Sequence, residues 1–384
     1  MTEKKKIIRT ATVPLSLDLF CRGLFRDLSS QYEIVVLSSP LPELEKIRER
    51  EGVRTIAVPM RRKIAPFHDL VSLFRLIKVF HQERPDMVHS ITPKAGLLSM
   101  MAAWFTRVPV RVHTFTGLIF PYERGWKRRL LMTTDRLTAA CATHVIPEGT
   151  GVRNDLIRLR ITRKPLRVLG NGNVRGIDLE HYARTDDVLQ KAAVIRKSFG
   201  IQEDDFVFLF VGRLDRDKGL DDLVDAFRAL LQENTHVHLL LVGSEDADGK
   251  DLLEQTRAYI GRSSHIHLSD GWQEDVRPWY AASDALVLPS WREGFPNVVI
   301  EAGAMDLASI VTNINGSREI VSNNRNGLIV PVQDAESLYF AMKSFADRPE
   351  RVHILASEAR KMVRRYEQGY VRECLAEFYK EVLK

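Results

Sequence analysis

The sequence predicts an α/β protein made of two doubly wound, Rossmann-like domains in tandem. Short apolar runs alternate with amphipathic stretches along the first 170 residues, and a second alternating series fills the rest of the chain. A turn-rich stretch, GNGNVRG at 170–176, separates the two series. We therefore expect a first domain over 1–170, a hinge over 171–186, a second domain over 187–365 and a last helix over 366–384.

Seven apolar runs predict the strands of the first domain: 7–13, 33–38, 53–58, 86–91, 110–115, 143–146 and 166–169. The stretches between them have helical periodicity. Residues 70–81, for example, place four apolar side chains on one helical face: Leu73, Leu76, Ile77 and Phe80. Strands and helices that alternate at this spacing are typical of a parallel sheet covered by helices.

In the second domain, FVFLFV at 206–211 and VHLLLV at 237–242 are continuously apolar, as expected of strands buried on both faces. Later runs predict strands at 285–288, 309–312 and 327–330, and residues 368–384 predict one amphipathic helix. Two such domains favour a ligand site at the carboxyl ends of the strands, in a central cleft where the domains face each other.

Charge is divided unevenly along the chain, which has a net charge of +6. Residues 1–170 hold 30 Lys and Arg against 15 Asp and Glu, a net of +15, and the remainder has a net of −9. A basic half indicates a polyanionic partner, either a nucleic acid or an anionic membrane, with solvated charge as the alternative. No zinc-finger spacing and no aromatic RNA-binding motif is present, so we expect no nucleic acid.

The sequence also predicts where the protein resides. The longest apolar run, 97–105, is too short to cross a bilayer, and the first residues do not resemble a signal peptide. Three widely spaced cysteines predict neither a disulfide framework nor a zinc site. We therefore expect a cytoplasmic protein.

The strongest site signal is WREGFPNVVIE at 291–301. Pro296 suits the first turn of a helix, which puts Glu293 on the preceding loop and Glu301 inside the helix. The helix N-terminus offers N–H groups to a diphosphate, and the two carboxylates can accept hydrogen bonds from sugar hydroxyls and a ribose. An ordinary capped helix with two exposed glutamates is the alternative. Candidate donor contacts here are Glu293, Gly294, Phe295, Pro296, Asn297, Val298 and Glu301.

The second signal is FVGRLDRDKG at 210–219. The strand ends at Gly212, so Arg213 and Lys218 follow its carboxyl end, where two fixed cations can neutralise a diphosphate leaving group. Gly212, Arg213 and Lys218 are therefore further candidate donor contacts, and Arg213, Lys218 and Glu293 are the candidate catalytic residues. Asp215 and Asp217 spell the D-x-D pattern of metal-dependent transferases. Beside three basic residues they are more simply a charge-balanced surface loop, and we expect no metal and no other cofactor.

Together, GRLDRDKG and EGFPNVVIE resemble glycosyltransferase family 4, the retaining enzymes of GT-B fold. In the first half, VHSITPKAGLLSMMAAW, VRVHTFTGL, THVIPEG and VLGNGNVRGID resemble the branch that builds bacterial capsule, O-antigen and glycoprotein glycans. The resemblance implies that Arg213 and Lys218 hold the donor diphosphate, Glu293 meets the donor sugar and Glu301 meets the ribose. It also implies that the last helix crosses back onto the first domain.

The chain departs from the family pattern in two places near the expected acceptor. Members often have a glycine pair after the first strand, where this chain reads VPLSLDL, and many have a histidine where this chain has Thr116. Strand-end histidines can face a site or be satisfied structural residues, and Lys94 can contact an acceptor phosphate or be a solvated first-turn lysine. Candidate acceptor or sugar contacts are Ser16, His89, Lys94, His113, Thr116 and Asn171.

A basic amphipathic segment, RGWKRRLLM at 124–132, resembles a membrane-surface or acceptor-binding element. A helix that packs Trp126 and Leu130 inward explains the same residues.

The sequence as a whole predicts a retaining, metal-independent hexosyl- or N-acetylhexosaminyltransferase. We expect it to take sugar from a UDP-sugar to a polyprenyl-diphosphate-linked saccharide, at the cytoplasmic face of the inner membrane. Two alternatives remain on the same fold, a nucleotide-sugar epimerase and a hydrolase. A nicotinamide dehydrogenase is disfavoured because no G-x-G-x-x-G follows the first strand.

Overall fold

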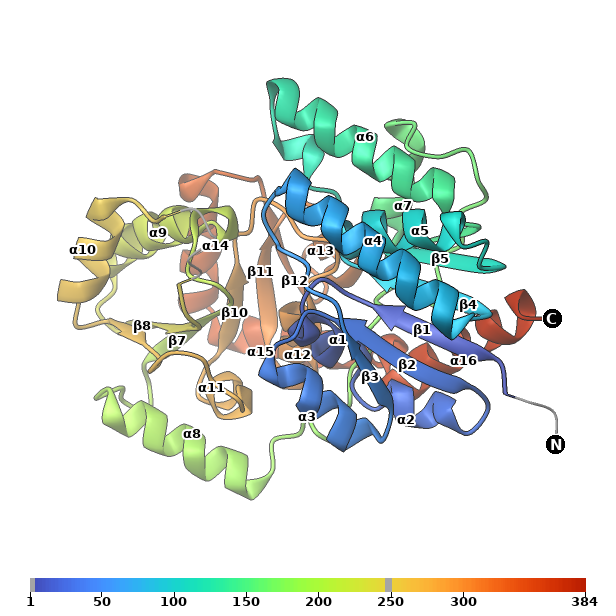
Figure 1. Ribbon diagram of the computed structural model, residues 1–384. Coiled ribbons are helices and arrows are strands. Elements are labelled where there is room, and N and C mark those ends of the chain that lie inside the picture. The colour runs from blue at the N-terminus through green and yellow to red at the C-terminus, as the bar shows by residue number, and fades with distance from the viewer. Residues whose placement is uncertain (1–3, 246–250) are drawn as a thin grey trace. The chain divides into compact units, whose positions relative to one another are not determined.

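The computed structural model describes residues 4–245 and 251–384 (Figure 1). The chain forms two compact units. Unit 1 is Met1–Gly176 with Gln368–Lys384, and unit 2 is Ile177–Glu367. Residues 171–186, expected as a hinge, are therefore shared between the units, and the boundary lies between Gly176 and Ile177.

Unit 1 holds a six-stranded sheet in the order β3-β2-β1-β4-β5-β6, with all neighbouring strands parallel. The strands are β1 Lys6–Thr10, β2 Glu33–Ser38, β3 Arg54–Ala57, β4 Met87–Ile91, β5 Val110–Phe115 and β6 His144–Pro147. The central strands β1 and β4 are almost entirely buried, as apolar strands covered on both faces should be.

Helices cover both faces of this sheet. Most of these helices follow a strand and run back against the sheet, so their N-termini lie at the carboxyl edge of the strands. One face packs against α4 Pro66–Glu83, α5 Pro93–Phe105, α6 Gly125–Cys141 and α7 Thr150–Arg158. The other face packs against α1 Pro14–Cys21, α2 Leu24–Ser29, α3 Pro42–Glu51 and α16 Gln368–Val382. A short 3-10 turn, η1 Phe120–Tyr122, precedes α6.

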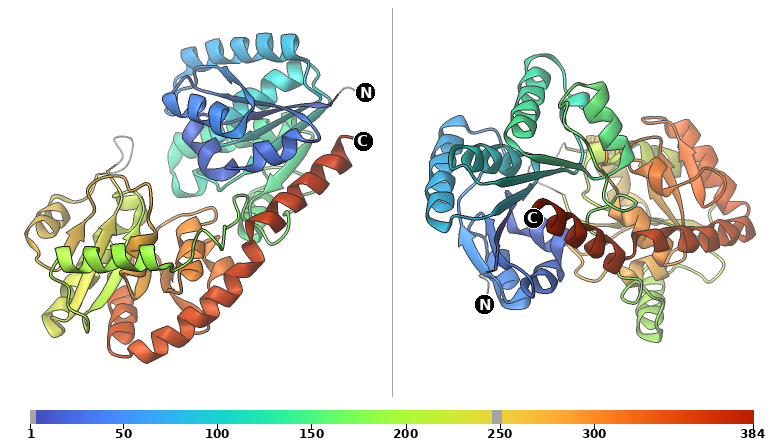
Figure 2. Two further views of the ribbon diagram at one scale, coloured as in Figure 1. Left: turned by 90° about the horizontal axis from the view of Figure 1, so that it is seen from below. Right: turned by 90° about the vertical axis from the view of Figure 1, so that its right-hand side faces the viewer.

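The C-terminal helix α16 packs on unit 1, as the family resemblance implies (Figure 2). Its Phe378 and Tyr379 are buried in the same apolar cluster as β1 and α1. Tyr379 also accepts a hydrogen bond from Arg9 on β1, at 2.6 Å.

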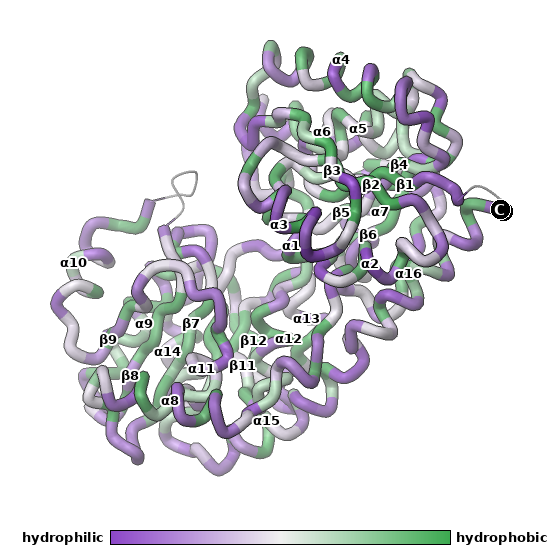
Figure 3. Tube along the Cα trace, turned by 60° about the horizontal axis from the view of Figure 1, so that its bottom comes forward, coloured by the Kyte–Doolittle hydropathy of each residue, from purple (hydrophilic) through white to green (hydrophobic). Residues whose placement is uncertain are grey.

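Unit 2 repeats the plan of unit 1. Its parallel sheet has the order β12-β11-β10-β7-β8-β9. The strands are β7 Phe206–Val211, β8 Val237–Val242, β9 Ile266–Leu268, β10 Ala285–Leu288, β11 Ala308–Thr312 and β12 Gly327–Val330. One apolar core spans both faces of this sheet, and the hydrophobic residues gather on the strands (Figure 3).

Most helices of unit 2 follow its strands in the same way. They are α8 Asp186–Ser198, α9 Leu220–Glu233, α10 Glu254–Arg262, α11 Arg277–Ala281, α12 Asn297–Ala304, α13 Ser317–Ile320, α14 Ala335–Ala346 and α15 Pro349–Val363. Two 3-10 turns, η2 Arg216–Lys218 and η3 Arg364–Tyr366, complete the unit. Within the described ranges, no helix of either unit has the length and apolar composition needed to cross a bilayer.

In each sheet, the first strand in sequence lies between the second and the fourth, so the direction of winding reverses there. Ligands of open α/β sheets bind outside the carboxyl ends of the strands at this switch point. The switch points are β1/β4 in unit 1 and β7/β10 in unit 2.

Two strand predictions differ from the structure. Residues 166–169 do not form a strand: Leu166 makes a single bridge to Val145. The preceding Pro165 has no N–H to donate, so it cannot add a rung to the edge of the sheet. Strand β9 was not predicted because three residues, Ile266–Leu268, are too few to establish a periodicity.

Candidate functional site

The two sequence motifs of unit 2 meet at the switch point of its sheet. The loop after β7 bears Arg213 and Lys218, and the loop after β10 bears Glu293. Because β7 and β10 are hydrogen-bonded neighbours, their carboxyl ends place these loops side by side.

Asp215 organises the loop after β7. Its buried carboxylate accepts the backbone N–H of Lys218 at 3.0 Å, which caps η2, and forms an ion pair with Arg213 at 2.9 Å. The next residue, Gly219, has φ +73°, and a Cβ there would lie 2.0 Å from the Pro289 carbonyl oxygen. Only glycine permits this approach, which brings the start of α9 against the end of β10.

Lys218 and Glu293 form an ion pair, and this contact joins the two motifs. Glu293 Oε1 also accepts a hydrogen bond from Ser290 Oγ at 2.8 Å, and the Ser290 carbonyl accepts one from Thr312 Oγ1. Both charged side chains of the pair are about four-fifths buried. The carboxylate is therefore held beside the lysine by Ser290, which is itself held by Thr312.

The two residues before Glu293 fasten its loop to the segment after β7. The Trp291 backbone N–H donates to the Asp217 carbonyl, and its indole N–H donates to the Asp222 carboxylate, both at 2.9 Å. Arg292 forms an ion pair with Asp217 at 2.8 Å. Burial raises the pKa of the Asp222 carboxyl, and the hydrogen bond from Trp291 partly offsets this rise.

Helix α12 begins at Asn297 with Pro296 as its N-cap, so Glu293 lies on the loop and Glu301 inside the helix, as the sequence predicts. Pro296 precedes the first helical residue, one position earlier than expected. Glu301 is buried and accepts a hydrogen bond from the Tyr280 hydroxyl at 2.9 Å. Its carboxylate is thus buried inside the unit and hydrogen-bonded, in contrast to a glutamate on an exposed helix face.

Gly316 holds a third loop against this helix start. With φ +72°, a Cβ on Gly316 would lie 2.4 Å from the Gly294 carbonyl oxygen and 2.7 Å from Phe295 Cα. The loop after β11 therefore packs directly on the segment 294–296, which carries predicted donor contacts.

The two carboxylates of the D-x-D sequence point to different partners. Asp215 pairs with Arg213 and Asp217 with Arg292, so the loop is charge-balanced as expected, although Asp215 is buried where a surface residue was predicted. Across residues 4–245 and 251–384, no three His, Cys, Asp or Glu side chains are grouped as a metal ion requires. Metal independence stays a prediction.

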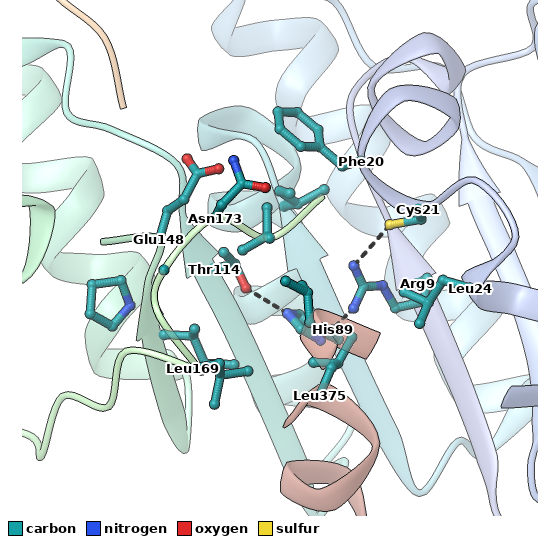
Figure 4. A pocket seen from close by; sticks show the side chains of 16 residues that line it. Arg9, Phe20, Cys21, Leu24, His89, Thr114, Glu148, Leu169, Asn173 and Leu375 are labelled. Carbon is teal, nitrogen blue, oxygen red and sulfur yellow. Dashed lines mark hydrogen bonds between the residues drawn. The ribbon is translucent and has the colours of Figure 1, made fainter. Parts of the chain in front are cut away.

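Among the acceptor candidates in unit 1, His89 lies inside a polar network (Figure 4). Its Nδ1 faces Arg9 Nη1 and the Tyr379 hydroxyl at 2.7 Å, and its Nε2 lies 2.7 Å from Thr114 Oγ1. A guanidinium can only donate, so Nδ1 accepts, and Nε2 carries the proton and donates to Thr114. Burial, Arg9 and His113 hold the pKa of His89 well below its ordinary value, so the ring is neutral.

This network lines a small cavity in unit 1 of about 30 Å³, enough for one or two water molecules. Arg9, Cys21, His89, Thr114, Glu148 and Asn173 contribute its polar wall. Of the predicted acceptor contacts, only His89 reaches this cavity.

His113 and Lys94 are also occupied by protein partners. His113 is buried, shares a hydrogen bond with Ser90 Oγ at 2.8 Å, and packs so closely on α5 that a Cβ on Gly96 would lie 2.3 Å from its ring. Burial lowers the pKa of His113 to about 3. Lys94 Nζ contacts both carboxylate oxygens of Asp69 at 2.7 Å, so it is an ion-paired lysine and not a solvated one.

The remaining candidates lie at the carboxyl edge of the unit 1 sheet. Ser16 is in the first turn of α1, Thr116 directly follows β5, and Asn171 is an exposed residue in the loop before the unit boundary. All three remain predictions.

Two threonines at the unit 1 switch point escaped the sequence analysis. Thr12 after β1 and Thr92 after β4 share a hydrogen bond of 2.9 Å between their hydroxyls, and Thr12 Oγ1 also accepts the Ala95 N–H. Thr92 has φ +77°, which is strained for a β-branched residue. No sequence motif marks such a pair, because the contact joins residues 80 positions apart.

The basic segment 124–132 forms the start of α6. Trp126 is 73% exposed and Leu130 is also exposed, so the packing explanation for this segment is wrong for both side chains. Lys127 forms an ion pair with Glu123 at 2.8 Å.

Comparison with protein families identifies two matching regions. The profile described as "Glycosyl transferases group 1" matches residues 192–362, and the profile described as "Glycosyl transferase 4-like domain" matches residues 20–172. The first region contains both motifs of the unit 2 site, and the two regions together span most of the chain.

Individual proteins give the same grouping. The chain is 29% identical to the capsular polysaccharide biosynthesis glycosyltransferase CapM of Staphylococcus aureus, over 100% of this chain and 98% of the relative. It is 29% identical, over 77% of this chain and 76% of the relative, to the Escherichia coli UDP-Gal:alpha-D-GlcNAc-diphosphoundecaprenol alpha-1,3-galactosyltransferase. Among solved structures, Anabaena Alr3699/HepE in complex with UDP and glucose has a TM-score of 0.81 at 18% identity, over 98% and 100% of the two chains.

Proposed function

The chain belongs to glycosyltransferase family 4 and has the GT-B fold, and from this premise we propose that it transfers a sugar from a UDP-sugar to a saccharide carried on a polyprenyl diphosphate. The transferred group is a hexose or N-acetylhexosamine. The reaction serves assembly of a bacterial surface polysaccharide or glycan, the role named for the S. aureus relative.

The ion pair between Lys218 and Glu293 is the observation that carries the proposal. It places a cation and a carboxylate together at a sheet switch point, beside the N-terminus of α12. A sugar diphosphate needs this combination: positive charge and backbone N–H groups for the phosphates, and a carboxylate for the sugar hydroxyls. Arg213 and Lys218 then bind the diphosphate, and Glu293 binds the donor sugar.

Both cations are paired with carboxylates before a donor arrives, Arg213 with Asp215 and Lys218 with Glu293. An incoming diphosphate competes for the same N–H donors, so Lys218 turns from Glu293 to a phosphate oxygen and frees the carboxylate for the sugar. Glu301, held by Tyr280, binds the ribose.

The proposed reaction retains the configuration of the anomeric carbon. The acceptor hydroxyl attacks that carbon on the face from which UDP departs, the bond between the carbon and the diphosphate oxygen breaks, and the leaving phosphate takes the hydroxyl proton. The products are UDP and the extended saccharide. Positive charge from Arg213, Lys218 and the α12 N-terminus stabilises the departing diphosphate, so no metal ion is required.

The acceptor belongs to unit 1. Residues 1–170, which make up most of unit 1, have a net charge of +15, which suits a diphosphate lipid in an anionic membrane. The E. coli relative is named for a diphosphoundecaprenol acceptor. We place the protein at the cytoplasmic face of the inner membrane, held peripherally.

A donor screen tests the donor assignment. A ligand that binds only the folded protein raises its stability by about 2.7 kcal/mol at one hundred times its dissociation constant. UDP and one UDP-sugar are expected to raise the melting temperature in the presence of EDTA, and Lys218→Ala is expected to lose the shift. Equal shifts with GDP- or ADP-sugars would contradict the choice of uridine.

A further inference from the structure

Helix α4 has two apolar faces, and only one of them packs on the protein. The inward face is buried against the unit 1 sheet and α5 through Leu73, Leu76 and Phe80. On the opposite side, the first half of the helix exposes Phe67 (77%), Leu70, Val71 and Phe74 (63%), and the preceding loop exposes Ile64. We call these five residues the α4 surface. Figure 3 shows α4 on the outside of its unit.

The exposed face is a continuous stripe limited to one end of the helix. Leu70 and Val71 lie three and four residues after Phe67, and Phe74 lies four and three residues after them, so the helical members share one side. The same side continues with exposed polar residues in the second half, at Lys78 and His81. The stripe therefore spans about 10 Å at a rise of 1.5 Å per residue, and it lies at the N-terminal end of α4. That end is at the carboxyl edge of the sheet, near Thr92 and Lys94.

Basic residues border the α4 surface. Arg61, Arg62 and Lys63 are exposed directly before it, and Arg75 and Lys78 lie beside and beyond it on the helix. Asp69 is the one acidic residue in the sequence between 61 and 78, and its carboxylate pairs with Lys94. An apolar stripe with a positive border is the pattern of helices that lie in the interface of an anionic bilayer.

A second copy of the chain fits this surface less well. A two-fold contact would place the basic border of one copy against the same border of the other. Five side chains also supply far less than the roughly 800 Å² per partner of a standard stable interface.

We propose that the α4 surface inserts into the interface of an anionic bilayer and sets the carboxyl edge of the unit 1 sheet at the lipid headgroups. The proposal rests on the proposed function, because it gives the lipid-linked acceptor its route to unit 1. The start of α6, with exposed Trp126, lies at the same edge and also packs on α5, so it is a second, smaller contact (Figure 1). The main anchor is thus α4, and not the segment 124–132.

The test is co-sedimentation of the full chain with vesicles of equal phosphatidylglycerol and phosphatidylcholine. Phe67→Ser with Phe74→Ser removes the two most exposed rings of the surface and is expected to lower the partition coefficient at least about tenfold. The matched control is Phe340→Ser with Ile354→Ser, two exposed apolar residues on α14 and α15 of unit 2, and it is expected to bind as wild type does.

Two further variants separate charge from insertion and α4 from α6. Arg75→Gln with Lys78→Gln is expected to weaken binding at low salt and to have little effect at high salt, because screening removes that attraction in wild type as well. Trp126→Ser is expected to lower the partition coefficient less than the double phenylalanine variant does.

Three results would overturn the proposal: vesicle binding of the double phenylalanine variant equal to wild type, a larger loss with Trp126→Ser, or wild-type protein that ignores anionic vesicles. A concentration-dependent dimer in ultracentrifugation, lost in the double phenylalanine variant while vesicle binding persists, would assign the surface to a second copy. Transfer to a detergent-solubilised lipid-linked acceptor is measured in parallel. Transfer without vesicle binding would contradict the proposed membrane contact and leave the proposed function intact. Vesicle binding without transfer would contradict the proposed function and leave the membrane contact intact.

Discussion

Replacing Lys218 with alanine separates a diphosphate-binding role from a purely structural one. Lys218 contacts Glu293 through its ammonium group, and the pair is mostly shielded from water. Loss of one preorganised charge that stabilises a leaving group costs about two orders of magnitude in turnover, or roughly 2.7 kcal/mol of transition-state stabilisation. Arg213→Ala is expected to have an effect of similar size and direction.

The matched control lies on the same 3-10 turn. Arg216 is two residues away, but its guanidinium forms an ion pair with Asp221 at 3.0 Å and not with Glu293. Arg216→Ala is therefore expected to keep turnover within about threefold of wild type and to act mainly on stability, because Arg216 pairs with the buried Asp221 carboxylate and with neither Lys218 nor Glu293. Turnover is measured as UDP release with a lipid-linked acceptor, and UDP affinity by calorimetry.

Glu293→Gln completes the design. If Lys218 binds the diphosphate, Lys218→Ala weakens UDP affinity both in wild type and in the Glu293→Gln background, because UDP lacks the transferred sugar that Glu293 is proposed to contact. If Lys218 only positions Glu293, Lys218→Ala has no effect on UDP affinity in the Glu293→Gln background. Turnover of Lys218→Ala and Arg213→Ala near that of wild type would refute the assignment of this loop.

Three further predictions concern metal, pH and packing. Turnover is expected to survive EDTA, and loss restored by Mg²⁺ or Mn²⁺ would make Asp215 and Asp217 a metal site. Burial lowers the pKa of His267 to about 4, so acidification protonates the unfolded chain first and unfolding becomes easier as the pH falls from 7 to 5. About 1 kcal/mol is expected after allowance for solvent screening, and a urea titration at both pH values should show His267→Asn losing part of this dependence. Tyr379→Phe leaves buried Arg9 without one acceptor and is expected to cost about 1–3 kcal/mol, which an unchanged urea midpoint would contradict.

The sequence was sufficient for the architecture because period and burial are local properties. Continuous apolar runs such as 206–211 and 237–242 mark strands covered on both faces, and the alternation with helices implies parallel pairing. The order of the strands did not follow from the pattern. Residues 166–169 were misassigned because apolar composition says nothing about the missing N–H of Pro165.

The positions of the candidate site residues were predicted from the sequence, but the contacts between them were not. Arg213, Lys218 and Glu293 were placed at the carboxyl edge from strand ends and from Pro296. Their pairing depends on Gly219 meeting Pro289 and Gly316 meeting Gly294, approaches between segments distant in sequence. No local pattern encodes such contacts.

Burial explains why the histidine candidates were hard to judge. His89 and His113 lie on strands near the predicted acceptor loops, but both ring nitrogens of His89 are engaged by Arg9 and Thr114, and Nδ1 of His113 is engaged by Ser90. A strand position fixes which face a side chain takes, and the partners on that face come from other strands and from α16. Sequence alone therefore left both roles open.

Direct analysis of the product tests the proposed sugar transfer. The protein is incubated with the UDP-sugar identified by the donor screen, EDTA and a polyprenyl-diphosphate-linked saccharide, and the lipid product is characterised by mass spectrometry and anomeric NMR. We expect one added hexose or N-acetylhexosamine, one UDP released per transfer, and the anomeric configuration of the donor in the new linkage. Equal consumption of the UDP-sugar without acceptor, giving free sugar or an epimer, would contradict it.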